Sequence, residues 1–249
     1  MTAFPNVGIA NKWAKQVVSG KIPACKWVKL ACKRHLDDLI KSKNKDFPYK
    51  FEPKLAEKKI AFIELLPHTK GEWAMKRLSI TLEPWQKFGI GCTFGWVRKK
   101  DGYRRFRESY WEVPRKNGKS AIAAAVGNYM FCADGEYAAE VYCGATTEKQ
   151  AWKVFSPALQ MVKKLPALRQ KYSVKPWAKK MTRPDGSLFA PVSRGSRAPR
   201  RSVPRRQTSG PAAPNSERIR ARRSRTRSSP SPVHRSPPAP SRRGSRCPC

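Results

Sequence analysis

Gly118-Lys119-Ser120 are the residues of this chain whose types and order best fit the binding of a phosphorylated nucleotide. The phosphate-loop pattern is G-x-x-x-x-G-K-[ST], and Val113 occupies the place of its first glycine. In such loops the glycine allows close backbone approach, the lysine ammonium reaches the β- and γ-phosphates, and the hydroxyl binds Mg²⁺. The spacing therefore predicts Gly118, Lys119 and Ser120 as nucleotide-binding residues and Ser120 as a magnesium ligand.

A second candidate, Gln86, ends the run Leu82-Glu83-Pro84-Trp85-Gln86 and lies 33 positions before Lys119. Its side-chain amide can donate to and accept from the edge of an adenine ring at the same time. The structural alternative is that Trp85 and Phe88 only mark a core helix. On the functional interpretation, Gln86 recognises the base.

A phosphate loop must leave a strand and open a helix, and both flanks of this loop have the required pattern. Residues 108–113 alternate polar and apolar side chains, which predicts a strand. Residues 119–132 place Ile122, Val126 and Tyr129 at helical spacing, with alanines between them. The N–H groups that begin this helix would point at the phosphates. The simpler interpretation is a strand, a basic turn and a helix without a ligand.

The chain beyond this helix predicts a parallel sheet. Residues 140–145 have the composition of a second strand, and Thr147 with Gln150 forms the capping box of a following helix. Ser156-Pro157 predicts an interruption and a new start of that helix. The repeat of strand, loop and helix favours a parallel α/β sheet with flanking helices. Residues 181–189 predict two strands joined by a Pro-Asp-Gly turn.

The first 80 residues are predicted to be helical, and their apolar faces are expected to serve packing. His35 and His68 are isolated histidines, which we interpret as structural. The three predicted faces comprise Ile9, Trp13 and Val17 in the first helix, Val28, Cys32, Leu36 and Leu39 in the second, and Ala56, Ile60, Ile63 and Leu66 in the third.

The net charge of +36 favours a nucleic-acid or other polyanionic partner, and it has two sources. Residues 1–193 contribute +21 with more Lys than Arg, whereas residues 194–249 contribute +15 from 16 Arg and one acid, Glu217. The second part contains ten Pro, no Lys and no aromatic residue. Its small apolar content predicts a disordered tail. The abrupt change from Lys to Arg favours a frameshifted end, and the alternative is a genuine Arg/Ser-rich tail that binds nucleic acid.

The seven cysteines form no CxxC or Cys/His cluster with zinc spacing, so we expect free thiols in a reducing cytoplasm. No apolar run of about 18 residues and no signal-peptide pattern is present. We therefore expect neither a membrane span nor secretion.

Several blocks in order resemble the large terminase subunit of tailed double-stranded DNA phages, from about residue 9 to about residue 193. The order of the blocks is more specific than any single block, and basic residues in place of the first loop glycine are usual in that family. The blocks are Val18-Ser19-Gly20-Lys21-Ile22, Lys70-Gly71-Glu72-Trp73, Leu82 to Gln86, Phe94-Gly95-Trp96, Arg104-Arg105-Phe106-Arg107, Val113 to Ser120, and Cys143-Gly144-Ala145-Thr146-Thr147 with Gln150-Ala151.

The resemblance implies an ATPase that uses ATP and Mg²⁺ to move double-stranded DNA into a procapsid. It further implies a following nuclease domain, and a small terminase subunit and a portal as partners in the cytoplasm of a bacterial host. Gln86 would match the glutamine that recognises adenine, Lys119 the phosphate lysine, and Ser120 the magnesium ligand. Arg115 would match a basic residue that contacts the γ-phosphate, and Thr146-Thr147 a segment that lies near DNA in related motors.

One departure from the family matters for activity. A P-loop ATPase needs a strand that ends in Asp-Glu, which holds magnesium through water and orients the attacking water. The sequence contains no Asp-Glu dipeptide, and no nuclease-type carboxylate cluster is evident. We therefore expect a truncated and catalytically incompetent form of the family's ATPase.

The expected organisation is a helical region over residues 1–80, an incomplete P-loop ATPase domain over 81–193, and the tail over 194–249. Two alternatives remain open at this point. One is a non-catalytic, basic nucleic-acid-binding protein with a vestigial P-loop, and the other is a helicase-like ATPase.

Overall fold

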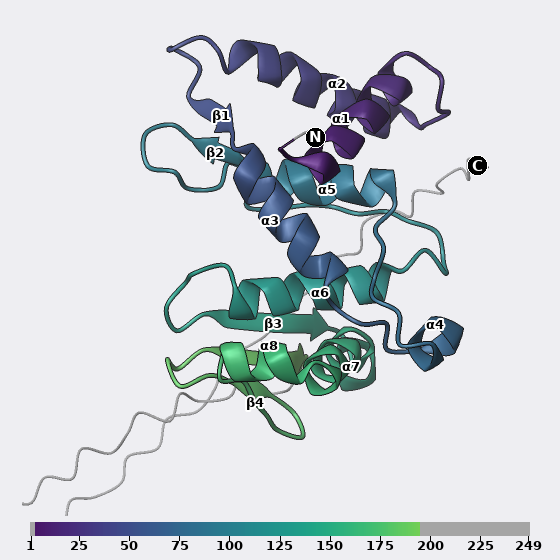
Figure 1. Cartoon of the computed structure of the whole chain (residues 1–249), viewed down its shortest axis with the longest axis vertical. Coiled ribbons are helices and arrows are strands. Elements are labelled where there is room, and N and C mark those ends of the chain that lie inside the picture. Colours follow the sequence, from purple (N-terminus) through teal and green to yellow (C-terminus); the bar gives the residue numbers. More distant parts are fainter. Residues whose placement is uncertain (1–2, 195–249) are drawn as a thin grey trace, which may run out of the picture. The chain divides into compact units, whose positions relative to one another are not determined.

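The computed structural model describes residues 3–194, all of which belong to one compact unit (Figure 1). The chain alternates helices and strands from α1 to β6 over this range. The expectations for a disordered or frameshifted tail concern residues that, except for Arg194, lie outside the described ones.

Four helices form the first part of the described chain. They are α1 (Pro5–Val18), α2 (Lys26–Lys41), α3 (Pro53–Glu64) and α5 (Pro84–Gly95), with the short α4 (Gly71–Met75) before α5. Helix α1 packs on α5 and α2, and α3 packs on α5. A short antiparallel pair, β1 (Tyr49–Phe51) and β2 (Trp96–Arg98), joins the loop before α3 to the end of α5. This pair had no signal in the sequence.

The predicted face of α3 is confirmed, whereas in α2 only Cys32 of the predicted face is buried, together with His35 and Asp38. Ala56, Ile60 and Ile63 of α3 are buried, and Leu66 follows them into the core, as the spacing predicted. The face of α1 is displaced: Val7, Ala10, Ala14 and Val17 are buried, whereas Ile9 is exposed. Small alanines allow α1 to approach its neighbours closely, and the larger Ile9 therefore lies outside the contact.

His35 and His68 occupy different environments. His35 is buried, its Nε2 lies 2.9 Å from Asn11 Oδ1, and its Nδ1 accepts the Trp96 indole N–H at 3.0 Å. Burial lowers the pKa of His35 to about 4. His68 packs its ring against Trp73, with 4.8 Å between the centroids, and burial lowers its pKa. Packing contacts account for both histidines, in agreement with the structural interpretation.

The second part is a mixed sheet covered by helices. Helix α6 (Lys119–Cys132) leads to β3 (Glu140–Ala145), and α7 (Glu148–Lys164), α8 (Pro166–Lys171), β4 (Lys175–Pro176), β5 (Met181–Thr182) and β6 (Leu188–Ser193) follow. The strand order is β3-β6-β5-β4. The β3–β6 pair is parallel, although the parallel sheet was predicted from residues 108–113 and 140–145. Strand β5 pairs antiparallel with β6 around a turn that contains Gly186 at φ +86°, as the Pro-Asp-Gly turn predicted.

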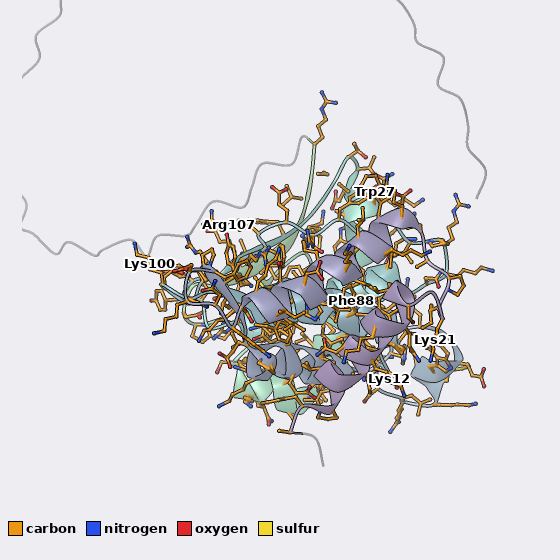
Figure 2. The ribbon with its side chains drawn as sticks, turned by 90° about the horizontal axis from the view of Figure 1, so that it is seen from above. Lys12, Lys21, Trp27, Phe88, Lys100 and Arg107 are labelled. Atoms are coloured by element: carbon orange, nitrogen blue, oxygen red, sulfur yellow. The ribbon has the colours of Figure 1, made fainter. Side chains whose placement is uncertain are left out.

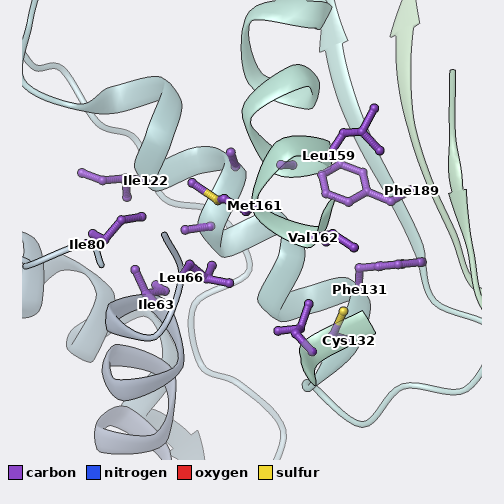
Figure 3. Close-up of a cluster of buried hydrophobic side chains, with 14 of the residues drawn as sticks. Ile63, Leu66, Ile80, Ile122, Phe131, Cys132, Leu159, Met161, Val162 and Phe189 are labelled. Carbon is purple, nitrogen blue, oxygen red and sulfur yellow. The ribbon is translucent and has the colours of Figure 1, made fainter. Parts of the chain in front are cut away.

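A single buried cluster connects the helical part to the sheet. Ile63 and Leu66 from the α3 side meet Ile122 of α6 and Met161 of α7, and Phe189 of β6 packs on the same helices (Figure 3). The α6 helix is apolar around most of its circumference because it contacts α3, α7 and the sheet. Burial against a sheet, predicted from its composition, is therefore confirmed and extends to two further helices.

Two sequence predictions are wrong. Residues 108–113 form no strand, since the segment between β2 and α6 has no ladder partner within residues 3–194, and an alternating pattern without a neighbouring strand cannot become a sheet. Pro157 does not interrupt α7, which continues through it. Pro157 is buried, and packing of α7 on α6, β3 and β6 outweighs the loss of one backbone hydrogen bond.

Candidate nucleotide-binding site

The predicted phosphate loop meets α6 with the geometry that its sequence requires. Gly118 is the N-cap of α6 with φ +71°, in the left-handed region that glycine adopts without cost. The Ile122 N–H donates to the Gly118 carbonyl at 2.9 Å and is the first bond of the helix. The amides of Lys119, Ser120 and Ala121 therefore precede the hydrogen-bonded ladder. An anion at this position would receive these amides and the positive end of the helix dipole.

The loop folds back on its own lysine. The Lys119 ammonium donates to the Val113 carbonyl and, at 2.7 Å, to the Pro114 carbonyl. Asn117 Nδ2 donates to the Pro114 and Arg115 carbonyls at 3.4 and 3.3 Å. These contacts close the loop around the position where phosphates would lie. A bound triphosphate would replace the two carbonyls as the partner of Lys119.

Arg115 and Ser120 are exposed at the same turn. The Ser120 hydroxyl has no hydrogen-bond partner among the described residues, so it is available to a ligand. Magnesium at nucleotide sites keeps several waters and takes one or two protein ligands together with phosphate oxygens. A single hydroxyl beside a phosphate-binding helix N-terminus fits this requirement. Within residues 3–194, no group of three His, Cys, Asp or Glu side chains forms a separate metal site.

Gln86 lies at the start of α5 and is buried, with 8% of its surface exposed. Its Oε1 accepts the Glu83 N–H at 2.9 Å in a capping box that fixes the first turn of α5. An amide oxygen has a second lone pair, and no described residue accepts from the Gln86 Nε2. The side chain therefore keeps one acceptor site and its donors for a base, in an orientation set by the helix cap.

An ion pair between the buried Lys87 and the half-buried Glu64 holds this turn in place. Lys87 Nζ lies 2.9 Å from Glu64 Oε1 and also donates to Asn6 Oδ1, which joins α5 to α3 and α1. The same Glu64 oxygen accepts the Leu82 N–H at 3.0 Å. Because Leu82 and Lys87 flank the capping box, the backbone on both sides of Gln86 is fixed.

The structure brings α5 and the phosphate loop together through Trp111, two residues before Val113. The Trp111 ring lies over Gly89, and its centroid is 6.0 Å from that of Trp85. Its Nε1–H donates to Ser109 Oγ at 2.6 Å, and the Thr93 and Ser109 hydroxyl oxygens are 3.4 Å apart. No direct contact joins Gln86 to Gly118, Lys119 or Ser120 within the described residues. The two halves of the predicted site are therefore linked by packing.

The segment Thr146-Thr147, which follows β3, lies at the same end of the sheet as the phosphate loop. Helix α6 runs opposite to β3, so the start of α6 and the end of β3 lie on one side of the sheet, as the β3 arrowhead indicates (Figure 1). Thr147 follows β3 and caps α7, where its Oγ1 accepts the Gln150 N–H at 3.3 Å. The Thr146 hydroxyl donates to Gln150 Oε1 at 2.6 Å. The predicted Thr147 cap is confirmed, but the Gln150 side chain bonds Thr146 and does not complete the predicted capping box.

Basic side chains surround this framework. Lys12, Lys21, Lys100 and Arg107 are exposed at the periphery, while Phe88 lies among the helices (Figure 2). A wide cleft of about 970 Å³ lies between α2, α5 and residues 106–117, and eight of its lining residues are Trp, Phe or Tyr. The cleft borders Trp111 and Val113, but neither Gln86 nor Lys119 lines it.

Comparison with protein families identifies the segment that carries these features. Residues 84–196 match the family model described as "Terminase large subunit, ATPase domain". The matched range is less than half of the chain. It begins at the first residue of α5 and includes the phosphate loop, the α6–β3 unit and β6.

The chain is also similar to a solved structure, the crystal structure of the HK97 bacteriophage large terminase. The identity is 23%, the match covers 57% of this chain and 28% of the HK97 protein, and the TM-score is 0.47. The chain thus spans about 28% of the length of that terminase. A comparison with curated proteins gave no match.

Sequence reasoning missed the residues that connect the two halves of the candidate site. Gly89 was not singled out, although a glycine inside an apolar helix signals close approach of another group, and Trp111 was interpreted only as part of a predicted strand. Lys87 and Glu64 were not singled out, since nothing in the spacing shows that they pair. Residues 3–194 contain no helix with the length and hydropathy needed to span a bilayer.

Proposed function

We propose that this chain binds ATP with Mg²⁺ between the first turn of α5 and the first turn of α6. Gly118, Lys119 and Ser120 hold the phosphates and the metal ion, Arg115 contacts the γ-phosphate, and Gln86 recognises adenine. The observation that carries the proposal is the left-handed Gly118 at the start of α6, which leaves three amides, an ammonium and a free hydroxyl on one exposed turn.

The test is nucleotide binding by the full 249-residue chain. Saturating Mg-ATP is expected to raise the free energy of unfolding by RT ln(1 + [L]/Kd), which is about 1.4 kcal/mol when the ligand is present at about ten times Kd. Lys119→Ala removes the ammonium and is expected to abolish the shift. Lys116→Ala, in the same loop, is the charge-matched control and should retain it. An equal shift in wild type and Lys119→Ala would contradict the proposed site.

The family supports a role for this ATP site in phage DNA packaging. In this role double-stranded DNA is the substrate that is moved, a small terminase subunit and a portal are partners, and the bacterial cytoplasm is the place of action. The exposed Lys and Arg side chains of residues 3–194 support an interaction with the DNA backbone. The loop that contains Thr146 and Thr147 lies at the phosphate-loop end of the sheet and is a candidate for communication with DNA.

We further propose that this polypeptide binds nucleotide without turning it over. The 249 residues contain no Asp-Glu dipeptide, and hydrolysis needs a carboxylate that orients the attacking water. Purified protein is expected to release no phosphate from ATP above the rate of a Lys119→Ala control. Steady hydrolysis that depends on Lys119 would show that another carboxylate takes this role and would contradict the proposed lack of turnover.

The second candidate function is a non-catalytic nucleic-acid-binding protein, favoured by the 16 Arg of residues 194–249. Each phosphate contact contributes about −0.9 to the slope of log K against log salt concentration. If residues 194–249 carry the binding, their deletion should reduce the magnitude of that slope by several units. A protein that binds DNA with steep salt dependence but shows no response to Mg-ATP would favour this candidate over the ATPase.

A further inference from the structure

Trp111, in the segment that leads into the phosphate loop, lies directly against the backbone of α5 at Gly89. A Cβ atom added to Gly89 would lie 2.5 Å from Cζ2 and 2.6 Å from Cη2 of Trp111. These distances are shorter than any that real Cβ atoms adopt. Only glycine at position 89 therefore lets the indole lie directly on the helix backbone.

Polar contacts hold the indole in this position. Its Nε1–H donates to Ser109 Oγ, and Ser109 lies against the Thr93 hydroxyl, which itself donates to the Gly89 carbonyl at 2.8 Å. The ring, two hydroxyls and one turn of α5 thus form a closed arrangement. Trp111 is the residue through which the otherwise irregular segment before the loop is attached to a helix.

This attachment lies between the two halves of the proposed site. Gln86 is one turn before Gly89 on α5, and Trp111 is two residues before Val113, whose carbonyl accepts the Lys119 ammonium. A nucleotide has a fixed range of distances between its base and its terminal phosphate. Both ends bind together only if the protein holds Gln86 and Lys119 at a compatible separation, since linked binding events depend on geometry.

We propose that Gly89 and Trp111 are positioning residues that set the distance between the base-recognising turn and the phosphate loop. This inference rests on the proposed ATP site and specifies how its two halves are kept in register. Neither residue needs to touch the nucleotide. Their role is to hold Gln86 and Lys119 at a separation that lets one nucleotide bind to both.

The decisive measurement compares two probes in the full 249-residue chain: Mg-ATP and magnesium tripolyphosphate, which lacks the base and the ribose. Calorimetric titration gives the ratio of the two Kd values, which reports how much the base adds to phosphate binding. Gly89→Ala forces the indole to move by about 1 Å to reach ordinary contact distance. We expect this variant to lose about tenfold of the ATP preference, equivalent to about 1.4 kcal/mol, while tripolyphosphate binding is retained.

The same helix offers a matched control. A Cβ at Gly91 would meet Ile60 Cδ1 at 3.7 Å and Ala56 Cβ at 3.9 Å, which is ordinary contact. Gly91→Ala makes the same chemical change at a similar place in α5 and should leave the ATP preference unchanged. A second substitution, Trp111→Phe in the Gly89→Ala background, removes the ring atoms that clash and is expected to restore part of the preference.

The outcomes separate the inference from the proposed function. If the wild-type chain binds neither probe, the ATP site itself is refuted and the inference with it. If it prefers ATP and Gly89→Ala keeps the wild-type ratio, the ATP site stands and the positioning role is overturned. If Gly89→Ala does not fold, Trp111→Phe alone replaces it as the test, because it breaks the contact without adding an atom; an unchanged ratio in that variant overturns the inference.

Discussion

The helices α1, α3 and α5 and the segment of residues 106–118 are kept in place by different means. These helices bury two charged residues, Lys59 and Lys87, and give each a carboxylate partner. None of residues 106–118 is buried, and Trp111 provides their main attachment to a helix. Regions with few buried contacts open at low free energy, and ligand-binding loops are commonly drawn from them. The comparison indicates that the helices provide stability and the segment provides the freedom to accept a ligand.

The largest effect is expected where a buried ion pair is broken. Lys59 Nζ lies 3.6 Å from Asp134 Oδ1 and 4.7 Å from the Tyr129 ring centroid, and burial lowers the pKa of Lys59 while Asp134 raises it. Asp134→Asn leaves a buried ammonium without a carboxylate and should cost about 3–5 kcal/mol of unfolding free energy.

Denaturant unfolding would measure this loss. Glu72→Gln breaks an exposed pair with Lys76 and is expected to change stability by less than about 1 kcal/mol. The double variant Lys59→Met with Asp134→Asn should recover much of the loss. Equal effects of Asp134→Asn and Glu72→Gln would contradict the distinction between the buried helices and the surface.

Acid should weaken the helical part through His35. Its Nδ1 accepts the Trp96 N–H, so Nε2 carries the proton donated to Asn11, and burial lowers the pKa from 6.5 to about 4. A depressed histidine pKa means that the unfolded chain binds the proton first. The stabilisation is therefore complete above pH 6.5 and is lost as the pH falls toward 4.

This loss amounts to about 3 kcal/mol, at about 1.4 kcal/mol for each unit of pKa shift. The free energy of unfolding measured across this pH range in wild type and in His35→Gln would isolate the contribution, because the lowered pKa of His68 acts in the same direction in both proteins. Parallel pH profiles for the two proteins would show that His35 is not the titrating group.

Substitution of Gly118 tests whether the left-handed backbone at the start of α6 requires glycine. At φ +71°, with Ile122 Cδ1 4.0 Å away as the nearest atom, an added Cβ meets little steric contact but must adopt the left-handed conformation. Gly118→Ala should therefore cost about 1–2 kcal/mol. Gly8→Ala, inside α1 with nothing within 4 Å, is expected to stabilise by about 0.5–1 kcal/mol. The same sign of change at both sites, measured by thermal unfolding, would contradict the conformational explanation.

The smallest effect is expected on the exposed segment itself. Tyr110 is 89% exposed, and Tyr110→Ala should change stability by no more than about 0.5 kcal/mol. Phe131→Ala, at a fully buried site in α6, should cost about 3–5 kcal/mol. If Tyr110→Ala destabilises by an amount close to that of Phe131→Ala, the segment contributes to the fold more than its exposure indicates.

The parts of the fold that could be predicted from sequence are those specified by local patterns. The range 119–132 for α6 and the range 140–145 for β3 match the predictions, because helical spacing, a glycine start and a capping threonine act within a few residues. The turn before β6 followed from Pro-Asp-Gly in the same way. The strand predicted at residues 108–113 failed, since a strand exists only with a neighbour that the local pattern does not contain.

The candidate site likewise contains residues that local patterns predict and residues that only tertiary contacts bring together. The loop residues Gly118, Lys119 and Ser120 were predicted from a motif, and their shared turn at the start of α6 agrees with the predicted arrangement. The connection from Gln86 to the loop depends on Gly89 and Trp111, which are 22 positions apart and meet only through packing. The pairing of Lys87 with Glu64 is of the same kind. Such contacts depend on tertiary structure, which no spacing rule provides.

The parallel pairing of β3 with β6 affects how the chain can fold. Glu140 and Leu188 are ladder partners 48 positions apart, whereas Thr182 and Leu188 of the β5–β6 pair are six positions apart. The longer closure costs about 1.8 kcal/mol more in chain entropy. We therefore expect the β5–β6 hairpin to form before the β3–β6 ladder. During synthesis, β3 is complete almost 50 residues before β6, so β3 lacks its ladder partner, and its backbone N–H and C=O groups stay unpaired on that edge, until those residues have been synthesised.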